Sequence, residues 1–300
     1  MKLLFACLFA FVTAYAQAGT LKIITSTADL AAITKEVGSS FVEVESIAKG
    51  TQDPHYIEPK PSYMVKTRDA DLVIAIGLSL EIGWLPSIIQ GSRNPKVNLA
   101  TNGYLEVGPF LNPLEKASGT LSRAQGDIHP DGNPHITLDP IRDGDMAVLI
   151  AKRLGELDNA HANDYLKNAQ QLQNRLLKKT EDWKARIEKT TIRKVITFHK
   201  TLTYFFDRFN LQNVAFLEPL PGIPPTPSHT LEVITLAKRE KVPLIMVENF
   251  FSMDAAQRVA SDVPGMRIAS VPVSVGGSDK VNKIDDLFEN LVLVIEGRGT

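Results

Sequence analysis

The stretch AHANDYLKNAQQLQNRLLKKTEDWKARIEKT, residues 160–190, divides the chain into two halves and decides how its fold is organised. It contains neither glycine nor proline and is rich in alanine, leucine, lysine, glutamine and glutamate, which favour helix. Its apolar residues recur mostly three, four or seven positions apart, at Leu166, Ala169, Leu172, Leu176, Trp183 and Ile187. This periodicity predicts one helix of about 30 residues and about 45 Å. We expect a continuous rod between two domains rather than two shorter surface helices.

Short β-branched runs alternate with helical patterns on both sides of this rod. Before it, the pattern predicts strands at 21–25, 42–48, 71–76 and 96–99, and helices at 28–37, 62–67 and 83–90. After it, strands are predicted at 193–197, 213–217, 242–247 and 267–271, and helices at 202–209, 228–239, 253–262 and 283–295. Such alternation is typical of parallel sheets built from βαβ units. The predicted fold class is therefore α/β, with two parallel-sheet α/β lobes joined by one long rigid helix.

We expect domain boundaries that follow this division. An amino-terminal lobe is expected over residues 19–157, the linking helix over 158–190 and a carboxyl-terminal lobe over 191–300. Residues 1–18 have the features of a cleaved signal peptide: Lys2, a short apolar run over 3–12, and a small-residue cleavage site at Ala16-Gln17-Ala18. The apolar run is too short for the roughly 20 residues that a membrane helix needs. The sequence therefore predicts export to the periplasm.

Cysteine usage limits the chemistry of the exported chain. Cys7 is the only cysteine and lies within the predicted signal peptide, too close to the start for a lipoprotein anchor. Any metal held outside the cytoplasm must then be bound by His, Asp or Glu.

Charge and motifs exclude several function classes. Lys and Arg number 33 and Asp and Glu 34, so the net charge is −1 and there is no basic excess for binding nucleic acid. The sequence contains no phosphate-binding loop, dinucleotide fingerprint or nucleophile elbow.

Three histidines occupy similar local settings. His55 follows Asp53-Pro54, His135 follows Asn133-Pro134, and His199 comes two residues after a predicted strand. Loops at the carboxyl ends of parallel strands are where ligand sites of α/β sheets collect, and a proline restricts the backbone beside it. Spacing alone leaves two interpretations open, plain surface histidines or a shared metal site. We expect His129 and His161 to be exposed to solvent and His229 to be structural, near a helix start.

The chain resembles the zinc/manganese solute-binding proteins of bacterial ABC transporters. The resemblance rests on five stretches in the family's order, namely DPHYIEPKPS (53–62), GLSLEIGWL (77–85), NPHITLDP (133–140), FHKTLTYFFDRFNL (198–211) and MVENFFS (246–252). It implies two α/β domains with a rigid helix between them, and metal ligands at His55, His135 and His199. It also implies transfer of the ion to an ABC-transporter permease in the inner membrane. We expect a monomer that is not an enzyme.

The chain departs from the family's pattern at the fourth ligand. The family commonly supplies an aspartate in an Asp-Pro pair, whereas Val271 precedes Pro272 here. The candidates that remain are Glu248, Asp279 or a water, with Glu248 expected to orient a histidine ring rather than to bind directly. Glu218, in a proline-rich loop over 218–225 that we expect to border the cleft, is a weaker candidate. In place of the family's histidine-rich loop the chain has His129 alone.

The expected ligands favour zinc. Three neutral imidazoles suit Zn²⁺, whereas Ca²⁺ and Mg²⁺ want oxygen ligands and Mn²⁺ prefers more carboxylate. Mn²⁺ stays the alternative cargo. An alternative from another class is a zinc-dependent hydrolase with three histidines, a bound water and Glu248 as base. A manganese-binding protein or an adhesin on the same scaffold is the remaining alternative.

Overall fold

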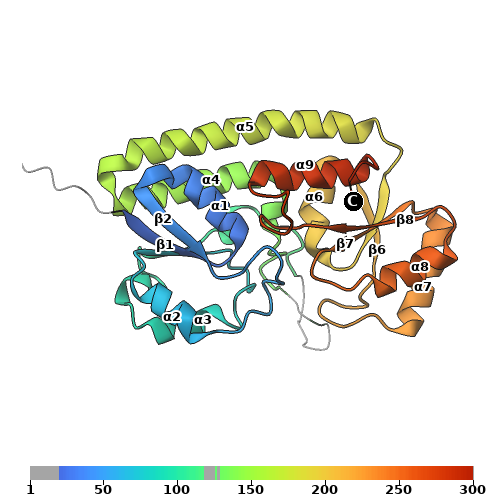
Figure 1. Ribbon diagram of the computed structural model, residues 1–300, viewed down its shortest axis with the longest axis horizontal. Coiled ribbons are helices and arrows are strands. Elements are labelled where there is room, and N and C mark those ends of the chain that lie inside the picture. Colours follow the sequence, from blue (N-terminus) through green and yellow to red (C-terminus); the bar gives the residue numbers. More distant parts are fainter. Residues whose placement is uncertain (1–19, 118–125, 127–128, 300) are drawn as a thin grey trace, which may run out of the picture.

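The computed structural model describes residues 20–117, 126 and 129–299 and places two four-stranded parallel sheets side by side (Figure 1). The first sheet has the order β2-β1-β3-β4 and comprises β1 (Leu21–Thr25), β2 (Val42–Ser46), β3 (Leu72–Ala75) and β4 (Tyr104–Glu106). The second has the order β6-β5-β7-β8 and comprises β5 (Lys194–Thr197), β6 (Gln212–Phe216), β7 (Leu244–Glu248) and β8 (Arg267–Val271). The predicted α/β fold class is confirmed. The predicted signal peptide lies outside the described residues.

Helices cover both faces of each sheet. The first sheet, which with its helices we call the N-terminal lobe, carries α1 (Ala28–Gly38), α2 (Pro61–Arg68), α3 (Leu85–Ser92) and α4 (Pro140–Leu157). The second, the C-terminal lobe, carries α6 (Thr203–Phe209), α7 (Pro227–Glu240), α8 (Asp254–Asp262) and α9 (Ile284–Ile295). In Figure 1, α1, α4 and α9 lie on the side of the long helix α5, and α2, α3, α7 and α8 lie on the opposite side.

The long helix α5 (Ala162–Glu188) runs along both lobes (Figure 1). It is 27 residues long, contacts α1 and α4 of the N-terminal lobe and contacts α9 of the C-terminal lobe. The predicted linking helix is confirmed, with one difference in its apolar stripe: Leu166 is 37% exposed and Tyr165 takes the inward position. No helix in the described part of the chain is both long and apolar enough to cross a membrane.

Buried contacts on α5 hold the two lobes together. One continuous apolar cluster runs from the first sheet through α5 to α9 and the second sheet. The guanidinium of Arg175 donates to Glu36 of α1 at 2.9 Å and to Asp285 of α9 at 3.1 Å, so a single side chain connects both lobes. Because a packed core transmits strain rather than absorbing it, this arrangement resists large movements between the lobes.

The strand predicted at 96–99 is wrong. The chain forms a 3-10 turn over Pro95–Val97 instead, and the edge strand β4 follows later. The side chain of Asn94 accepts the backbone N–H of Lys96 at 3.0 Å, and Pro95 has no N–H to offer to a sheet. Local turn chemistry therefore outweighs the apolar composition of this segment.

The 18-residue helix α4 was not predicted from the sequence. Its start is marked by Asp139, whose carboxylate accepts the N–H of Ile141 at 2.9 Å, and by Pro140 in the first turn. Gly144 weakens the helical pattern, but it lets α4 approach α5 closely: a Cβ there would lie 2.9 Å from Cγ of Gln173. The glycine thus serves packing between helices.

Candidate metal centre

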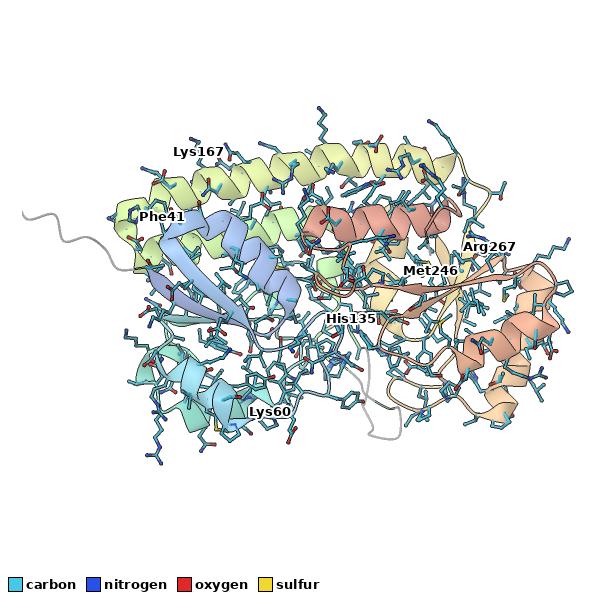
Figure 2. All side chains as sticks on the ribbon, viewed as in Figure 1. Phe41, Lys60, His135, Lys167, Met246 and Arg267 are labelled. Atoms are coloured by element: carbon cyan, nitrogen blue, oxygen red, sulfur yellow. The ribbon has the colours of Figure 1, made fainter. Side chains whose placement is uncertain are left out.

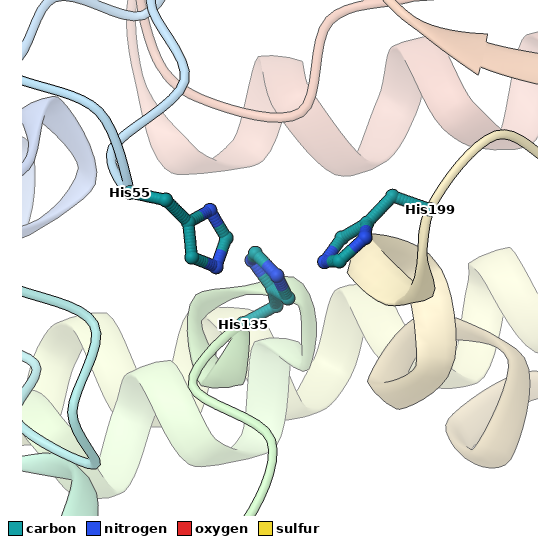
Figure 3. Close-up of side chains that lie close together, drawn as sticks. All are labelled: His55, His135 and His199. Atoms are coloured by element: carbon teal, nitrogen blue, oxygen red, sulfur yellow. The ribbon is translucent and has the colours of Figure 1, made fainter. Parts of the chain in front are cut away.

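Three histidine side chains converge between the lobes. Each of His55, His135 and His199 offers one ring nitrogen, and the three nitrogens lie within 4.8 Å of one another. The ring centroids are separated by 5.1 Å for His55 and His135, 5.5 Å for His55 and His199, and 5.2 Å for His135 and His199. Figure 3 shows the three rings pointing toward one another from three separate segments. This is the cluster that the sequence predicted.

The cluster lies where residues of both lobes meet, and Figure 2 shows His135 between them. A cavity of about 40 Å³ beside His135 is lined by residues of both lobes, among them Ala48, Thr137 and Phe250. His199 follows β5, whose neighbours β6 and β7 lie on opposite sides of it, so the strand order reverses there. Crevices at such switch points are the usual ligand sites of open α/β sheets.

The two X-Pro-His sequences fold into matching turns. The backbone N–H of His55 donates to Oδ1 of Asp53 at 3.0 Å, and the N–H of His135 donates to Oδ1 of Asn133 at 2.9 Å. An Asp or Asn side chain commonly closes a turn on the backbone two residues later, with a proline fixing the residue between. Each motif therefore sets the direction of its histidine before any ligand arrives.

Further hydrogen bonds anchor these turns to the scaffold. The indole of Trp84 donates to the Pro54 carbonyl at 2.9 Å. The side chain of Asn133 donates to the Lys200 carbonyl at 3.1 Å, and the hydroxyl of Tyr204 donates to the Asn133 carbonyl at 2.7 Å. The turn that carries His135 is thus tied to the segment that carries His199.

Carboxylates orient two of the three rings. Oδ1 of Asp53 lies 2.7 Å from Nδ1 of His55, and Oε1 of Glu218 accepts from Nδ1 of His199. Burial acts to raise the pKa of Asp53, but the hydrogen bond and charge of His55 outweigh it and lower the pKa. An ionised carboxylate only accepts, so Nδ1 of His55 carries the proton and Nε2 presents a lone pair. Metal-bound histidines usually have such partners.

The pKa values of the other two rings of the cluster shift in opposite directions. Burial lowers the pKa of His135 well below its ordinary value, and nearby histidines add to the effect, so this ring is held neutral. Nε2 of His135 is buried and has no hydrogen-bond partner within the described residues. Burial also acts to lower the pKa of His199, but the hydrogen bond to Glu218 and nearby carboxylates raise it overall.

The acidic residues considered as a fourth ligand differ in what they contact. Glu248, at the end of β7, is fully buried; its Oε1 accepts the backbone N–H of His199 at 3.2 Å, and burial raises its pKa to about 7. Glu218, which the sequence ranked lower, contacts the His199 ring instead, and its second oxygen accepts the N–H of Gly222 at 3.1 Å. Asp279 is exposed in the loop before α9, outside the three-residue group found within the described chain.

The remaining histidines differ in their surroundings. His161 stacks on Phe41 with ring centroids 3.8 Å apart, so the expectation of a solvated side chain is wrong there. His229 lies in the first turn of α7 and donates from Nε2 to the Phe216 carbonyl at 3.0 Å, a structural role as expected. His129 does not extend into solvent either: its Nε2 lies 3.2 Å from Nε2 of His55. Its sequence signals are its place six residues before His135 and its position where the family often has a histidine-rich loop.

Residues 23–295 match the family described as the zinc-uptake complex component A, periplasmic, and the chain belongs to this family. Members of the family are substrate-binding components of metal ABC transporters rather than enzymes, so the hydrolase interpretation is set aside.

Characterised relatives carry the names of several metals. The manganese ABC transporter substrate-binding lipoprotein PsaA of Streptococcus pneumoniae is 24% identical over 247 residues, covering 81% of this chain and 76% of the relative. The iron-binding protein YfeA of Yersinia pestis is also 24% identical over 247 residues, covering 80% and 73%. The family therefore includes proteins named for zinc, manganese and iron.

Solved structures share the whole two-lobe arrangement. A crystal structure of ZnuA superposes with a TM-score of 0.79 at 23% identity, covering 94% of this chain and all of that one. The laminin-binding protein Lmb of Streptococcus agalactiae, described as bifunctional with adhesin and metal-transporting activity, gives a TM-score of 0.73 at 25% identity, covering 92% and 98%.

Proposed function

We propose that this protein captures one divalent transition metal ion between its lobes and delivers it to an ABC-transporter permease. Zinc is the favoured ion. His55, His135 and His199 are the proposed ligands. The observation that carries the proposal is the convergence of three ring nitrogens within 4.8 Å from segments far apart in the chain. The unpartnered Nε2 of buried His135 supports it, because a buried polar atom is rarely left without a partner.

The chemistry of the proposed ligands favours zinc as the bound ion. Imidazole nitrogens suit Zn²⁺, and the carboxylates on two of the rings act on Nδ1, which leaves Nε2 for the metal. Manganese would be favoured if Glu248 or Asp279 supplied oxygen ligands, and both keep that proposed role as alternatives.

The proposed site of action is the periplasm, after cleavage of residues 1–18. There the protein would act as a monomer with lobes over 19–157 and 191–300 and a linking helix over 158–190. The partner would be the permease and ATPase of an inner-membrane transporter. Membership of the zinc-uptake family supports this partner.

Metal titration tests the binding step. Zinc added to metal-stripped protein in competition with a chelating indicator should bind at one ion per chain. His55→Ala, His135→Ala and His199→Ala should each weaken binding by at least about tenfold, since losing a ligand costs no less than losing an outer partner. His229→Ala, which alters a half-buried histidine outside the cluster, is the matched control and should bind as the wild type.

Transport tests the delivery step. Zinc-loaded protein added to proteoliposomes that contain the cognate permease and ATPase should stimulate ATP hydrolysis and zinc accumulation, whereas His135→Ala should not. Tight zinc binding without stimulation would contradict delivery, and stoichiometric binding that survives all three alanine variants would contradict the site.

A further inference from the structure

We propose that His129 is the fourth ligand of the metal, which makes the site one of four imidazoles. The inference rests on the proposed function and names a residue that neither the sequence motifs nor the three-histidine group includes. Nε2 of His129 lies 3.2 Å from Nε2 of His55, and the ring centroids are 5.3 Å apart. His129 lies six residues before His135, so it reaches the cluster from the same loop.

The hydrogen bonds on the far side of each ring leave both facing nitrogens available to bind a metal ion. Nδ1 of His129 lies 3.0 Å from the Leu78 carbonyl oxygen, and because a carbonyl only accepts, Nδ1 must donate. The neutral ring then presents a lone pair at Nε2. His55 reaches the same state, because its Nδ1 donates to Asp53. Two lone pairs that face each other at 3.2 Å repel unless a metal ion or an additional proton bridges them.

The distance itself matches a zinc site. Tetrahedral zinc with Zn–N bonds of about 2.0–2.1 Å places neighbouring ligand nitrogens roughly 3.3 Å apart. The 3.2 Å separation between Nε2 of His55 and Nε2 of His129 is close to this value. His129 is outside the group of three histidines whose ring nitrogens all lie within 4.8 Å of one another, and it contacts that group through His55. To bind the same ion, its ring must move toward His135 and His199 when the ion binds.

The turn that contacts Nδ1 of His129 has an unusual backbone conformation. Gly77, Leu78 and Ser79 all have positive φ, at 74°, 54° and 67°. Side-chain-bearing residues rarely adopt this conformation, and such strain concentrates at ligand sites. The buried carboxylate of Glu81 stabilises the turn by accepting the N–H groups of Gly77, at 3.0 Å, and of the residue before it, at 2.8 Å. The turn presents the Leu78 carbonyl to His129 Nδ1 as a fixed acceptor.

Among the described residues, the other candidates for the fourth ligand are placed differently from His129. Val271, at the end of β8, is fully buried and offers no ligand atom. Glu248 accepts the His199 N–H with Oε1, whereas its Oε2 is buried without a hydrogen-bond partner within the described residues; Asp279 is exposed. A fourth nitrogen in place of an oxygen would also set the selectivity, because an all-imidazole site favours zinc over manganese.

X-ray absorption at the zinc edge tests the inference directly. Zinc-loaded wild type should show four imidazole ligands, and His129→Ala should show three imidazoles plus a lighter oxygen ligand. Competition titration should show zinc affinity reduced by at least about tenfold in His129→Ala and in His129→Asn, with a smaller preference for zinc over manganese. His229→Ala is the control and should match the wild type in both measurements.

The outcomes separate this inference from the proposed function. Three imidazoles in the wild type, with unchanged affinity in His129→Ala, would overturn the fourth ligand and leave the three-histidine site standing. A wild type that binds no zinc would overturn the proposed function itself. A third outcome would show a structural role. In that case His129→Ala loses zinc affinity and its metal-free form melts far below the metal-free wild type, whereas His129→Asn keeps full zinc affinity. That result would make the inference wrong.

Discussion

The carboxylate of Asp29 in the N-terminal lobe accepts a 2.7 Å hydrogen bond from the backbone N–H of Val275 in the C-terminal lobe. Asp29 is 3% exposed, and its second oxygen accepts the hydroxyl of Ser274 at 2.9 Å. The first turn of α1 is thereby joined to the loop after β8, and Asp29, Ser274 and His135 all line the same cavity. This contact, like those of α5, holds the two lobes together and so helps to set the spacing of His55, His135 and His199.

Removal of this contact should weaken the fold. Asp29→Ala leaves the buried N–H of Val275 without an acceptor, which should lower the free energy of unfolding by about 1–3 kcal/mol. Urea unfolding of the metal-free protein measures this. Asp207→Ala, on the exposed side of α6, is the control and should change stability by less than about 0.5 kcal/mol. Equal effects of the two substitutions would show that the contact does not hold the lobes.

The same carboxyl predicts a pH dependence. Burial raises the pKa of Asp29 from 3.8 to about 6, against hydrogen bonds from Val275, Ser274 and Thr137 that lower it. The folded protein therefore holds a proton that the unfolded chain has released, and the resulting stability is lost as pH rises through about 6. Between pH 4.5 and 7 the unfolding free energy of wild type should fall by about 2 kcal/mol relative to Asp29→Asn. A difference that stays constant over this range would contradict the assignment.

The carboxylate on the His199 ring should matter for metal affinity without being a ligand. Glu218→Gln keeps an acceptor for Nδ1 but removes the charge, so zinc binding should weaken about 10-fold, and Glu218→Ala should approach about 100-fold. Competition titration measures both. Glu232→Gln is the matched control, because Glu232 is exposed and lies 3.5 Å from the ring of His229, outside the cluster. Should Glu218→Gln bind zinc as tightly as the control, the carboxylate has no role in orienting the ring.

The long helix should be intolerant of interruption. Lys178 is exposed near the middle of α5, so Lys178→Ala should be nearly neutral, whereas Lys178→Pro should destabilise the protein by about 3 kcal/mol or more. Thermal unfolding of both variants shows whether the stability of the whole protein depends on a continuous α5 or whether α5 is a surface helix that contributes little. Similar melting temperatures for the two variants would favour the surface helix.

Segments whose signal is local could be predicted from the sequence. The apolar period of α5 and the β-branched runs of seven of the eight strands lie within single stretches of chain. The failures have local causes too: Asn94 and Pro95 form a turn in an apolar segment, and Gly144 weakens the pattern of α4 because it serves packing against α5.

The site was predictable only in part. His55, His135 and His199 stand in recognisable motifs, and the Asp53 and Asn133 turns show why those motifs point the rings inward. Contacts between distant segments carry no such signal. His129 lies 74 residues from His55, and Glu218 lies 19 residues from His199, so neither contact could be predicted from the sequence alone.

Anomalous scattering from crystals grown with zinc tests the central claim most directly. One strong peak at the zinc edge should lie between the lobes, about 2.0–2.1 Å from a ring nitrogen of each of His55, His135 and His199. A peak bound elsewhere on the chain, or zinc-saturated crystals with no peak among these three rings, would contradict the account.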